Sequence, residues 1–388
     1  MIPLEAIFWI GLFLLFYTYL GYPLLLIVAN KILSLKSLSN KEFEKGLVVS
    51  ILIAAYNEEK VIGDKLKNCL VLDYPAELLQ IYVASDGSSD KTNDIAKRYA
   101  EKDKRIHLLE FSRTGKSGVL NKAMAYIKSE IIVFSDANTE YMRDALKNLV
   151  KHFSDEKVGC VCGRLIYRNP GEVVSGKGEN FYWRYETKIK KLESNLGYVA
   201  GANGAIYAIR REIFETLPTE TINDDFTISM KIVQSGFKCV YDENAIAYED
   251  VAPNMESEFR RHVRDGAGHY IAMCHLMGLL NPFLGIRSFI YWSHRVLRWV
   301  APFVLVVLFF LNMFLLNNLF YLSLFILQIG FYLLAVVGLI YTKTKKLPFF
   351  MYTPFYFVNL NLALLLGFLK AVTGRQKMTW ERTEREAL

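Results

Sequence analysis

Acidic side chains follow several apolar runs of this sequence, where they could bind a cation or move a proton. Asp86 follows QIYVAS, Asp136 follows IIVFS, and Asp224 and Asp225 lie in the polar segment TINDD. Carboxylate oxygens suit hard divalent cations, and a positioned carboxylate can take the proton of a hydroxyl group. Each group also has a structural explanation, because D-G-S-S-D forms a good turn and helix N-cap and adjacent acids are commonly solvated. Because these acids occur together at the ends of expected strands, we favour a functional site over these structural explanations.

Several familiar motifs are incomplete. Lys116 lies in a Gly-Lys-Ser run, but Glu110 stands where a phosphate-binding loop needs its first glycine. The GANG run at 201–204 is not a dinucleotide fingerprint, H-E-x-x-H is absent and the six His are scattered, so we expect no zinc site. Cys160 and Cys162 form a C-x-C on an expected strand, which indicates packed core thiols.

The region from 47 to about 250 must supply the elements that position these acids. The expected strands are 47–56, 80–85, 106–111, 131–135 and 158–165, and the expected helices are 57–72, 90–100, 118–127 and 143–152. This alternation predicts an α/β fold with a mostly parallel, doubly wound sheet. Ligands of such sheets bind at the carboxyl ends of the strands, where Asp86 and Asp136 fall.

The composition indicates a membrane protein with one large polar insertion. Of 388 residues 52% are hydrophobic, which excludes a disordered chain, and five Cys are too few for a disulfide-stapled domain. Uncharged or nearly uncharged apolar runs occupy 6–29, 300–341 and 348–369, each long enough to cross a bilayer. The net charge of +7 suits contact with anionic membrane lipids, and we do not expect nucleic-acid binding.

The charges beside these runs predict the orientation only in part. Lys31, Lys36 and Lys41 follow the first run, so the positive-inside rule places the polar domain in the cytoplasm and the protein in the plasma membrane, as a multi-pass protein. Three C-terminal spans would leave the basic tail outside, although basic residues favour the inside. Either the tail is an exception, or one segment is interfacial or re-entrant.

Five regions follow from this pattern. We expect an N-terminal anchor (1–32), a cytoplasmic domain (47–255), interfacial amphipathic helices (256–299), C-terminal membrane segments (300–370) and a basic tail (371–388). The tail also carries Trp380, which is typical of an interfacial anchor; a loop that reaches back to the active site is the alternative.

The motifs together resemble glycosyltransferase family 2, in particular its membrane-integrated members related to cellulose and hyaluronan synthases. The matching strings are SILIAAYNEE, VASDGSSDKT, GKSGVLNKAM, IIVFSDANTEY, TINDDFTISMKI and EFRRHVR, in this order over about 47–270. The resemblance implies a GT-A-type fold, a nucleotide-diphosphate-sugar donor, most readily a UDP-sugar, and an inverting transfer to a saccharide or lipid-linked acceptor.

The resemblance also assigns roles to single residues. Asp86 contacts the nucleotide base, Lys116 lies near the base or the diphosphate, and Asp136 binds the ribose and, with Asn138, an Mg²⁺ or Mn²⁺ ion. Asp225 is the general base, with Asp224 as the alternative. The nucleotide pocket and the diphosphate grip are completed by Ala55, Tyr56, Glu58, Arg261 and Arg264.

Two motifs depart from the family pattern. The D-x-D motif reads Asp136-Ala137-Asn138, and an amide oxygen is a weaker metal ligand than a carboxylate. The Q-x-x-R-W motif reads R-H-V-R-D, in which Arg264 keeps the arginine while Arg261 and Asp265 replace the other two. Contact with lipid headgroups is an alternative role for these arginines. The missing tryptophan weakens the case for a processive synthase; a single-addition transferase and, less readily, a non-catalytic nucleotide-sugar-binding subunit are the rivals.

Overall fold

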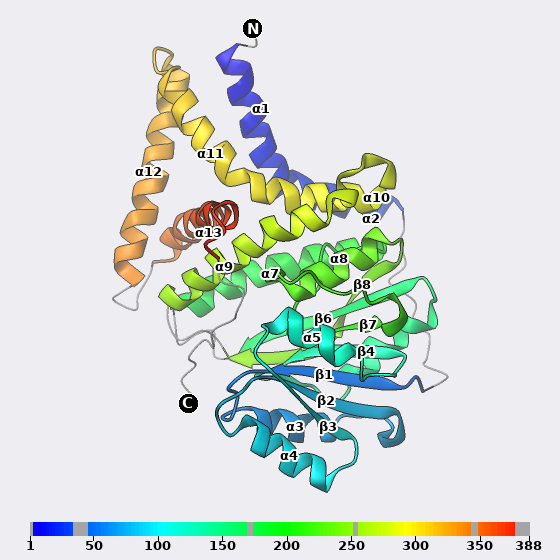
Figure 1. Cartoon of the computed structure of the whole chain (residues 1–388). Coiled ribbons are helices and arrows are strands. Elements are labelled where there is room, and N and C mark those ends of the chain that lie inside the picture. The colour runs from blue at the N-terminus through cyan, green and yellow to red at the C-terminus, as the bar shows by residue number, and fades with distance from the viewer. Residues whose placement is uncertain (1–2, 34–45, 169–173, 251–254, 343–347, 377–388) are drawn as a thin grey trace.

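The computed structural model describes residues 3–33, 46–168, 174–250, 255–342 and 348–376. Figure 1 shows an α/β domain below a group of long helices. Lys36, Lys41 and the tail with Trp380, on which part of the predicted orientation depends, lie outside the described residues.

Eight strands form one sheet in the order β3-β2-β1-β4-β7-β6-β8-β5. Their bounds are β1 Val49–Ala55, β2 Leu79–Asp86, β3 Ile106–Phe111, β4 Ile131–Asp136, β5 Glu140–Tyr141, β6 Val158–Arg168, β7 Tyr207–Arg210 and β8 Lys238–Asp250. The neighbours β3-β2-β1-β4 and the pair β6-β8 are parallel, whereas β7 and β5 run antiparallel to their neighbours. The mostly parallel sheet is therefore confirmed.

The described helices are α1 Leu4–Phe16, α2 Tyr22–Ile32, α3 Ile62–Leu70, α4 Thr92–Lys102, α5 Lys116–Met124, α6 Ala145–Val150, α7 Val174–Asn195, α8 Asp224–Gln234, α9 Met255–His275, α10 Ile286–Ile290, α11 Leu297–Met313, α12 Leu319–Thr342 and α13 Phe349–Val372. Helix α3 begins five residues later than expected, because Asn57 takes a left-handed conformation (φ 55°) and a turn follows it. Left-handed backbone ends regular structure, and Asn adopts it more readily than most residues.

Two apolar cores lie on the two faces of the sheet. One joins α3, α4 and α6 to the sheet. The other joins α5 and α8 to the sheet and continues into α9 and α11 through Tyr270, Tyr291 and Trp299. The catalytic domain and the apolar helices thus share one core, which fixes their relative position. Cys160 and Cys162 are fully buried in it, as predicted.

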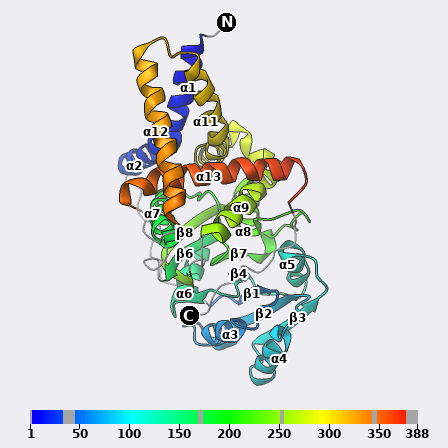
Figure 2. The same ribbon diagram turned by 90° about the vertical axis from the view of Figure 1, so that its left-hand side faces the viewer.

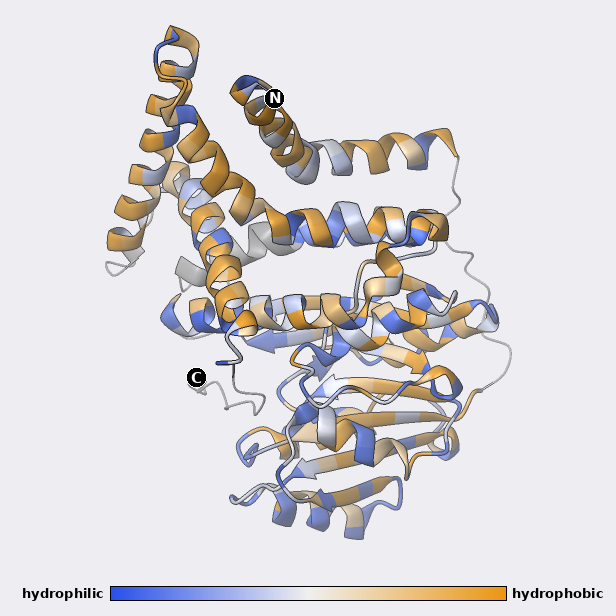
Figure 3. Ribbon diagram, turned by 45° about the horizontal axis from the view of Figure 1, so that its top comes forward, coloured by the Kyte–Doolittle hydropathy of each residue, from blue (hydrophilic) through white to orange (hydrophobic). Residues whose placement is uncertain are grey.

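Four helices are long and apolar enough to cross a membrane: Leu4–Ile32, Ile286–Met313, Leu319–Tyr341 and Phe350–Val372. The first bends at a π-helical turn, Tyr17–Gly21, so that α1 projects away from the domain while α2 lies alongside it (Figures 1 and 3). Helix α12, which contains the third of these segments, stands next to α11. Figure 3 shows both helices as largely hydrophobic.

Helix α13 differs in direction from α11 and α12. It is seen nearly end-on in Figure 1 and runs across the molecule in Figure 2, where it crosses α12. It packs closely on α9: a Cβ atom on Gly367 would lie 2.7 Å from the backbone nitrogen of Ala267. Only a glycine permits this distance, so α9 holds α13 against the side of the molecule that faces the domain.

Candidate active site

Asp86 ends β2 and is completely buried. Its carboxylate accepts hydrogen bonds from Arg113 Nη1 (2.7 Å) and from the backbone nitrogens of Thr114 (2.6 Å) and Gly115 (2.9 Å). Gly115 has φ +84°, which an L side chain rarely adopts, so the loop can fold its N–H groups onto the carboxylate. Asp86 therefore anchors the loop that leads into α5; its contact with a base stays a prediction.

Arg113 and Tyr56 form a flat surface beside Asp86. The guanidinium carbon of Arg113 lies 3.2 Å from the ring centroid of Tyr56. Behind this surface the loops after β1 and β2 bind each other, since Glu58 N donates to Thr92 Oγ1 (2.7 Å) and Ser89 N donates to Asn57 Oδ1 (2.8 Å). Ala55, at the end of β1, and Glu58 lie in the same region; their part in a nucleotide pocket stays a prediction.

Lys116 joins the acid at the end of β4 to the acids at the start of α8. It is the first residue of α5, and its ammonium lies 2.9 Å from Asp136 Oδ1 and 3.2 Å from Asp224 Oδ1. Burial of the amine opposes its charge, but Asp136, Asp224 and Asp225 together raise the pKa of Lys116 well above the usual lysine value. The side chain therefore stays an ammonium between the two carboxylates.

Asp225 is a half-buried carboxyl with a raised pKa. Burial, and then the neighbouring charge of Asp224, raise the pKa of Asp225 to about 7, although Lys116 opposes this shift. A carboxylate with this pKa is a better proton acceptor near neutral pH than an ordinary aspartate. Phe226 N donates to Asp225 Oδ1 (2.8 Å), which fixes the carboxylate and leaves its second oxygen for another partner.

Gly204 lies between the two acidic groups. A Cβ atom on this residue would be 3.4 Å from Asp136 Oδ2, 3.5 Å from Asp225 Oδ2 and 3.6 Å from Lys116 Nζ. The absent side chain leaves a space that both carboxylates face. A reacting group held there would meet both groups of acids at once.

Hydrogen bonds between distant segments bring these groups together. Ser117 Oγ donates to Thr221 O (2.5 Å), and Asn121 on α5 exchanges two 2.9 Å bonds with the backbone of Leu217. Both contacts tie α5 to the loop before α8. Asn223, the residue before α8, donates through Nδ2 to Asp265 O on α9 (2.9 Å). Sequence spacing alone does not show these contacts.

The acidic groups fit a metal that arrives with other ligands. Among the described residues no group of three His, Cys, Asp or Glu side chains could hold a metal by itself. Asp136 offers a carboxylate, and Asn138 Nδ2 lies 3.2 Å from Glu249 Oε1, which brings a second carboxylate beside the motif. These are oxygen donors of the kind that Mg²⁺ and Mn²⁺ prefer, and diphosphate oxygens would complete the set.

Arg261 and Arg264 lie on α9, whose backbone contacts Asn223 just before the acidic pair. Gly268 makes this approach close, because a Cβ atom there would come within 2.5 Å of Asn223 Oδ1. The grip of these arginines on a diphosphate stays a prediction.

The apolar helices reach the site through the backbone of Ala200. Glu193 on α7 accepts from Ala200 N (3.0 Å), and Arg295 Nε donates to Ala200 O (2.6 Å). Glu193 also accepts from Tyr22 Oη (2.6 Å) at the start of α2 and lies 2.6 Å from His294 Nδ1. Gly204 lies four residues further along this loop, so the apolar helices help to position the backbone next to Asp136 and Asp225.

Three residues of the site were missed by sequence reasoning. Arg113, Glu249 and Gly204 lie at its centre, yet each stands outside the acidic motifs. Glu249 near the end of a long β-branched strand and the paired glycines of GANG were the available signals. Neither signal is specific without the fold.

The comparisons with known proteins agree with this geometry. Residues 50–217 match the family model "Glycosyl transferase family 2". Beta-monoglucosyldiacylglycerol synthase of Trichormus variabilis is 32% identical over 199 residues, which are 50% of this chain and 42% of that protein. Poly-beta-1,6-N-acetyl-D-glucosamine synthase of Staphylococcus aureus is 25% identical over 224 residues, which are 57% of this chain and 54% of that protein. The chain thus spans about half the length of these curated relatives.

One solved structure resembles nearly the whole chain. The mannosyltransferase from Pyrobaculum calidifontis in complex with GDP-Man and Mn²⁺ superimposes with a TM-score of 0.71 over 96% of this chain and 100% of that one, at 22% identity. At this identity the likeness shows the fold: a GT-A-like mixed sheet with flanking helices, combined with long apolar helices.

Proposed function

We propose that this protein, whose residues 50–217 match the glycosyl transferase family 2 model, is a membrane-bound inverting glycosyltransferase that adds one sugar to an acceptor held at the membrane. The observation that carries the proposal is the group formed by Lys116, Asp136, Asp224 and Asp225 around the space above Gly204. We propose a UDP-sugar as the donor, with GDP-mannose as the alternative.

Each side chain has a part in the transfer. Tyr56 and Arg113 would hold the nucleotide beside Asp86, and Lys116 would bind the diphosphate, with Arg264 as a further cation. Asp225 would take the proton of the acceptor hydroxyl as that oxygen attacks the anomeric carbon. General base catalysis of this kind contributes about 10²–10⁴-fold to the rate. The attack comes from the side opposite the diphosphate, so the anomeric configuration inverts.

Asp136, Asn138 and Glu249 would hold the divalent cation. When bound, Mg²⁺ or Mn²⁺ neutralises the negative charge that grows on the departing diphosphate. The mannosyltransferase of the same fold holds Mn²⁺ together with GDP-Man, which supports this assignment.

The helices beside the site favour a single addition over polymer export. Tyr22, Glu186, Glu193, His294 and Arg298 form one buried polar network between the start of α2, α7 and α11, with each side chain at most 8% exposed. Because these side chains are buried, they do not line an open passage between α2, α7 and α11 of the kind that polymer export would need. The T. variabilis relative, whose name describes a glycolipid synthase, points in the same direction.

A polysaccharide is the second acceptor that we consider. The relative named as a poly-N-acetylglucosamine synthase supports it. The two functions differ in product length, which can be measured.

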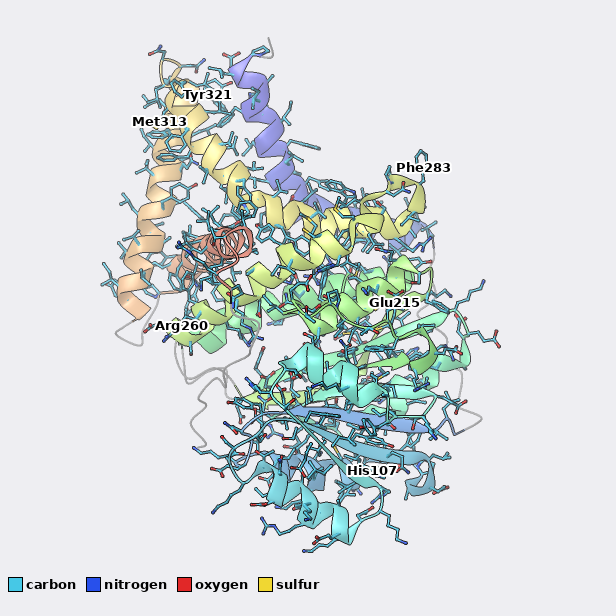
Figure 4. All side chains as sticks on the ribbon, viewed as in Figure 1. His107, Glu215, Arg260, Phe283, Met313 and Tyr321 are labelled. Carbon is cyan, nitrogen blue, oxygen red and sulfur yellow. The ribbon has the colours of Figure 1, made fainter. Side chains whose placement is uncertain are left out.

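Exposed apolar side chains favour a membrane location. They stand on α2, on the turn Pro282–Leu284, whose Phe283 is 94% exposed and projects outward in Figure 4, and on α13. We propose that α1, α11 and α12 cross the plasma membrane while α2, α9, α10 and α13 lie at its cytoplasmic surface, with the catalytic domain below them.

The test is release of nucleoside diphosphate by the purified protein in lipid nanodiscs. UDP-sugars and GDP-mannose would be supplied with Mn²⁺, Mg²⁺ or chelator, together with diacylglycerol or a membrane lipid extract. We expect metal-dependent release with one donor, a labelled lipid carrying one sugar, and a loss of at least 10²-fold in Asp225→Asn. Asp73→Asn, an exposed acid far from the site, is the control. A ladder of long products would favour the polymer function, and full activity of Asp225→Asn would refute the assigned base.

A further inference from the structure

Lys116 stands where a cation would meet the carboxylates of the site. Its ammonium bridges Asp136 at the end of β4 and Asp224 at the start of α8, 2.9 and 3.2 Å away. Its side chain is 20% exposed, so it is not sealed off from solvent. We propose, on the premise of the function above, that Lys116 is a displaceable counter-ion that excludes a divalent metal from the free protein until a nucleotide diphosphate draws the ammonium away.

Charge repulsion is the first argument. A metal on Asp136 would lie within a few ångströms of the Lys116 ammonium, and like charges at such distances repel each other strongly where water is scarce. Entry of the metal alone would therefore compete with Lys116 for Asp136 and place a second cation beside the ammonium, which would be left with Asp224.

The composition of the metal site is the second argument. Asn138 supplies a neutral oxygen where the family motif has an acid, and no three-carboxylate group among the described side chains compensates for it. The protein alone therefore offers weak metal ligands. A bound diphosphate would remove both obstacles to metal binding. Its oxygens would add ligands for the metal, and they would give Lys116 a new anionic partner.

The inference concerns the order of binding and can be tested without catalysis. The free Mn²⁺ signal in electron paramagnetic resonance would be titrated with full-length protein in nanodiscs, with and without UDP or GDP. We expect wild-type protein to bind Mn²⁺ at least tenfold more tightly with nucleotide than without. Lys116→Met should bind Mn²⁺ without nucleotide at least tenfold more tightly than wild type, whereas Lys122→Met, on the same helix, should match wild type.

The outcomes separate this inference from the proposed function. Equal Mn²⁺ affinity of the wild type with and without nucleotide would overturn the inference, and so would an unchanged Mn²⁺ affinity of Lys116→Met. If nucleotide tightens Mn²⁺ binding by the wild type and Lys116→Met gains metal binding, but no sugar nucleotide releases its nucleoside diphosphate, the counter-ion role stands and the transferase proposal fails. Should Lys116→Met not fold, the wild-type comparison decides alone.

Discussion

At the scale of single residues, the space above Gly204 gives the first prediction. Gly204→Ala places a methyl group 3.4–3.6 Å from Asp136, Asp225 and Lys116, which is ordinary contact, so the protein should fold normally. The methyl group would occupy the position proposed for the transferred sugar. We expect binding of the sugar nucleotide to weaken at least tenfold, with binding of the nucleoside diphosphate unchanged, as measured by calorimetry.

Gly63→Ala on α3 is the matched control, because a Cβ atom there also meets only ordinary contacts. It should leave both affinities unchanged. Equal weakening of sugar nucleotide and nucleoside diphosphate by Gly204→Ala would show that this glycine supports the nucleotide pocket and not the sugar.

The pKa of Asp225 gives the second residue-scale prediction. As the base of the free enzyme, with a pKa raised to about 7 by burial and Asp224, it loses its proton only near neutrality. The value of kcat/KM should therefore be constant above about pH 7.5 and fall about tenfold per pH unit below about pH 6.5. A profile that is flat down to pH 5 would contradict the assignment.

The raised pKa of Asp225 also affects the stability of the fold. Whereas activity should rise with pH, the contribution of this carboxyl to stability should fall. Because its pKa is raised on folding, the folded state holds the proton more tightly, and stability falls as the pH rises from about 4 to about 7. Asp225→Asn removes this loss, which corresponds to at most about 4 kcal/mol above pH 7 at about 1.4 kcal/mol per pKa unit. Thermal unfolding at pH 8 should show Asp225→Asn at least as stable as wild type, whereas Asp224→Asn should gain nothing because it breaks the pair with Lys116.

The residues of the site were accessible to sequence reasoning to different degrees. Asp86 and Asp136 could be located because strand ends follow from apolar runs and ligands bind there, whereas Asp225, at the start of α8, was identified through the family resemblance. Arg113 and Glu249 could not, since their importance depends on contacts made across the sheet edge. Lys116 was placed near the diphosphate, but its bridge between two carboxylates requires α5 and α8 to be adjacent, which only the fold shows.

At the scale of elements, α9 and α13 depend on glycine at their crossing. Gly367→Ala would bring a Cβ atom to 2.7 Å from Ala267 N, an atom of the backbone that cannot move aside. Overpacking of this kind costs about 1–3 kcal/mol. We expect a lower midpoint of thermal unfolding in detergent for Gly367→Ala. Gly330→Ala on α12, where a Cβ atom meets nothing within 4 Å, should not change it.

Element boundaries show what a sequence pattern omits. The parallel strands were predictable from their β-branched runs, but the antiparallel direction of β7 and β5 was not, because periodicity carries no information on direction. The apolar run that became α13 has the composition of a membrane span. Its direction is set by close packing on α9 through Gly367, a contact that neither hydropathy nor charge encodes.

At the scale of the whole molecule, the direction of α13 reconciles the basic tail with the membrane. If α1, α11 and α12 cross and α13 lies in the plane of the surface, as its course across the molecule in Figure 2 favours, the end of α13 is on the side of the α/β domain. Lys370 and Arg375 then lie on the cytoplasmic side, where basic residues are favoured. Three membrane crossings therefore satisfy the positive-inside rule, whereas four crossings would place these basic residues outside.

Cysteine labelling in intact cells tests this arrangement. The four cysteines other than Cys274 are buried, so Cys274→Ser gives a background without an exposed thiol. In that background Asn317→Cys, between α11 and α12, should react with a membrane-impermeant maleimide, whereas Arg375→Cys should react only after the membrane is permeabilised. Reaction of Arg375→Cys in intact cells would mean that α13 crosses the bilayer. In that case its packing on α9 could not persist in the membrane, and the proposed placement of α13 at the cytoplasmic surface would be wrong.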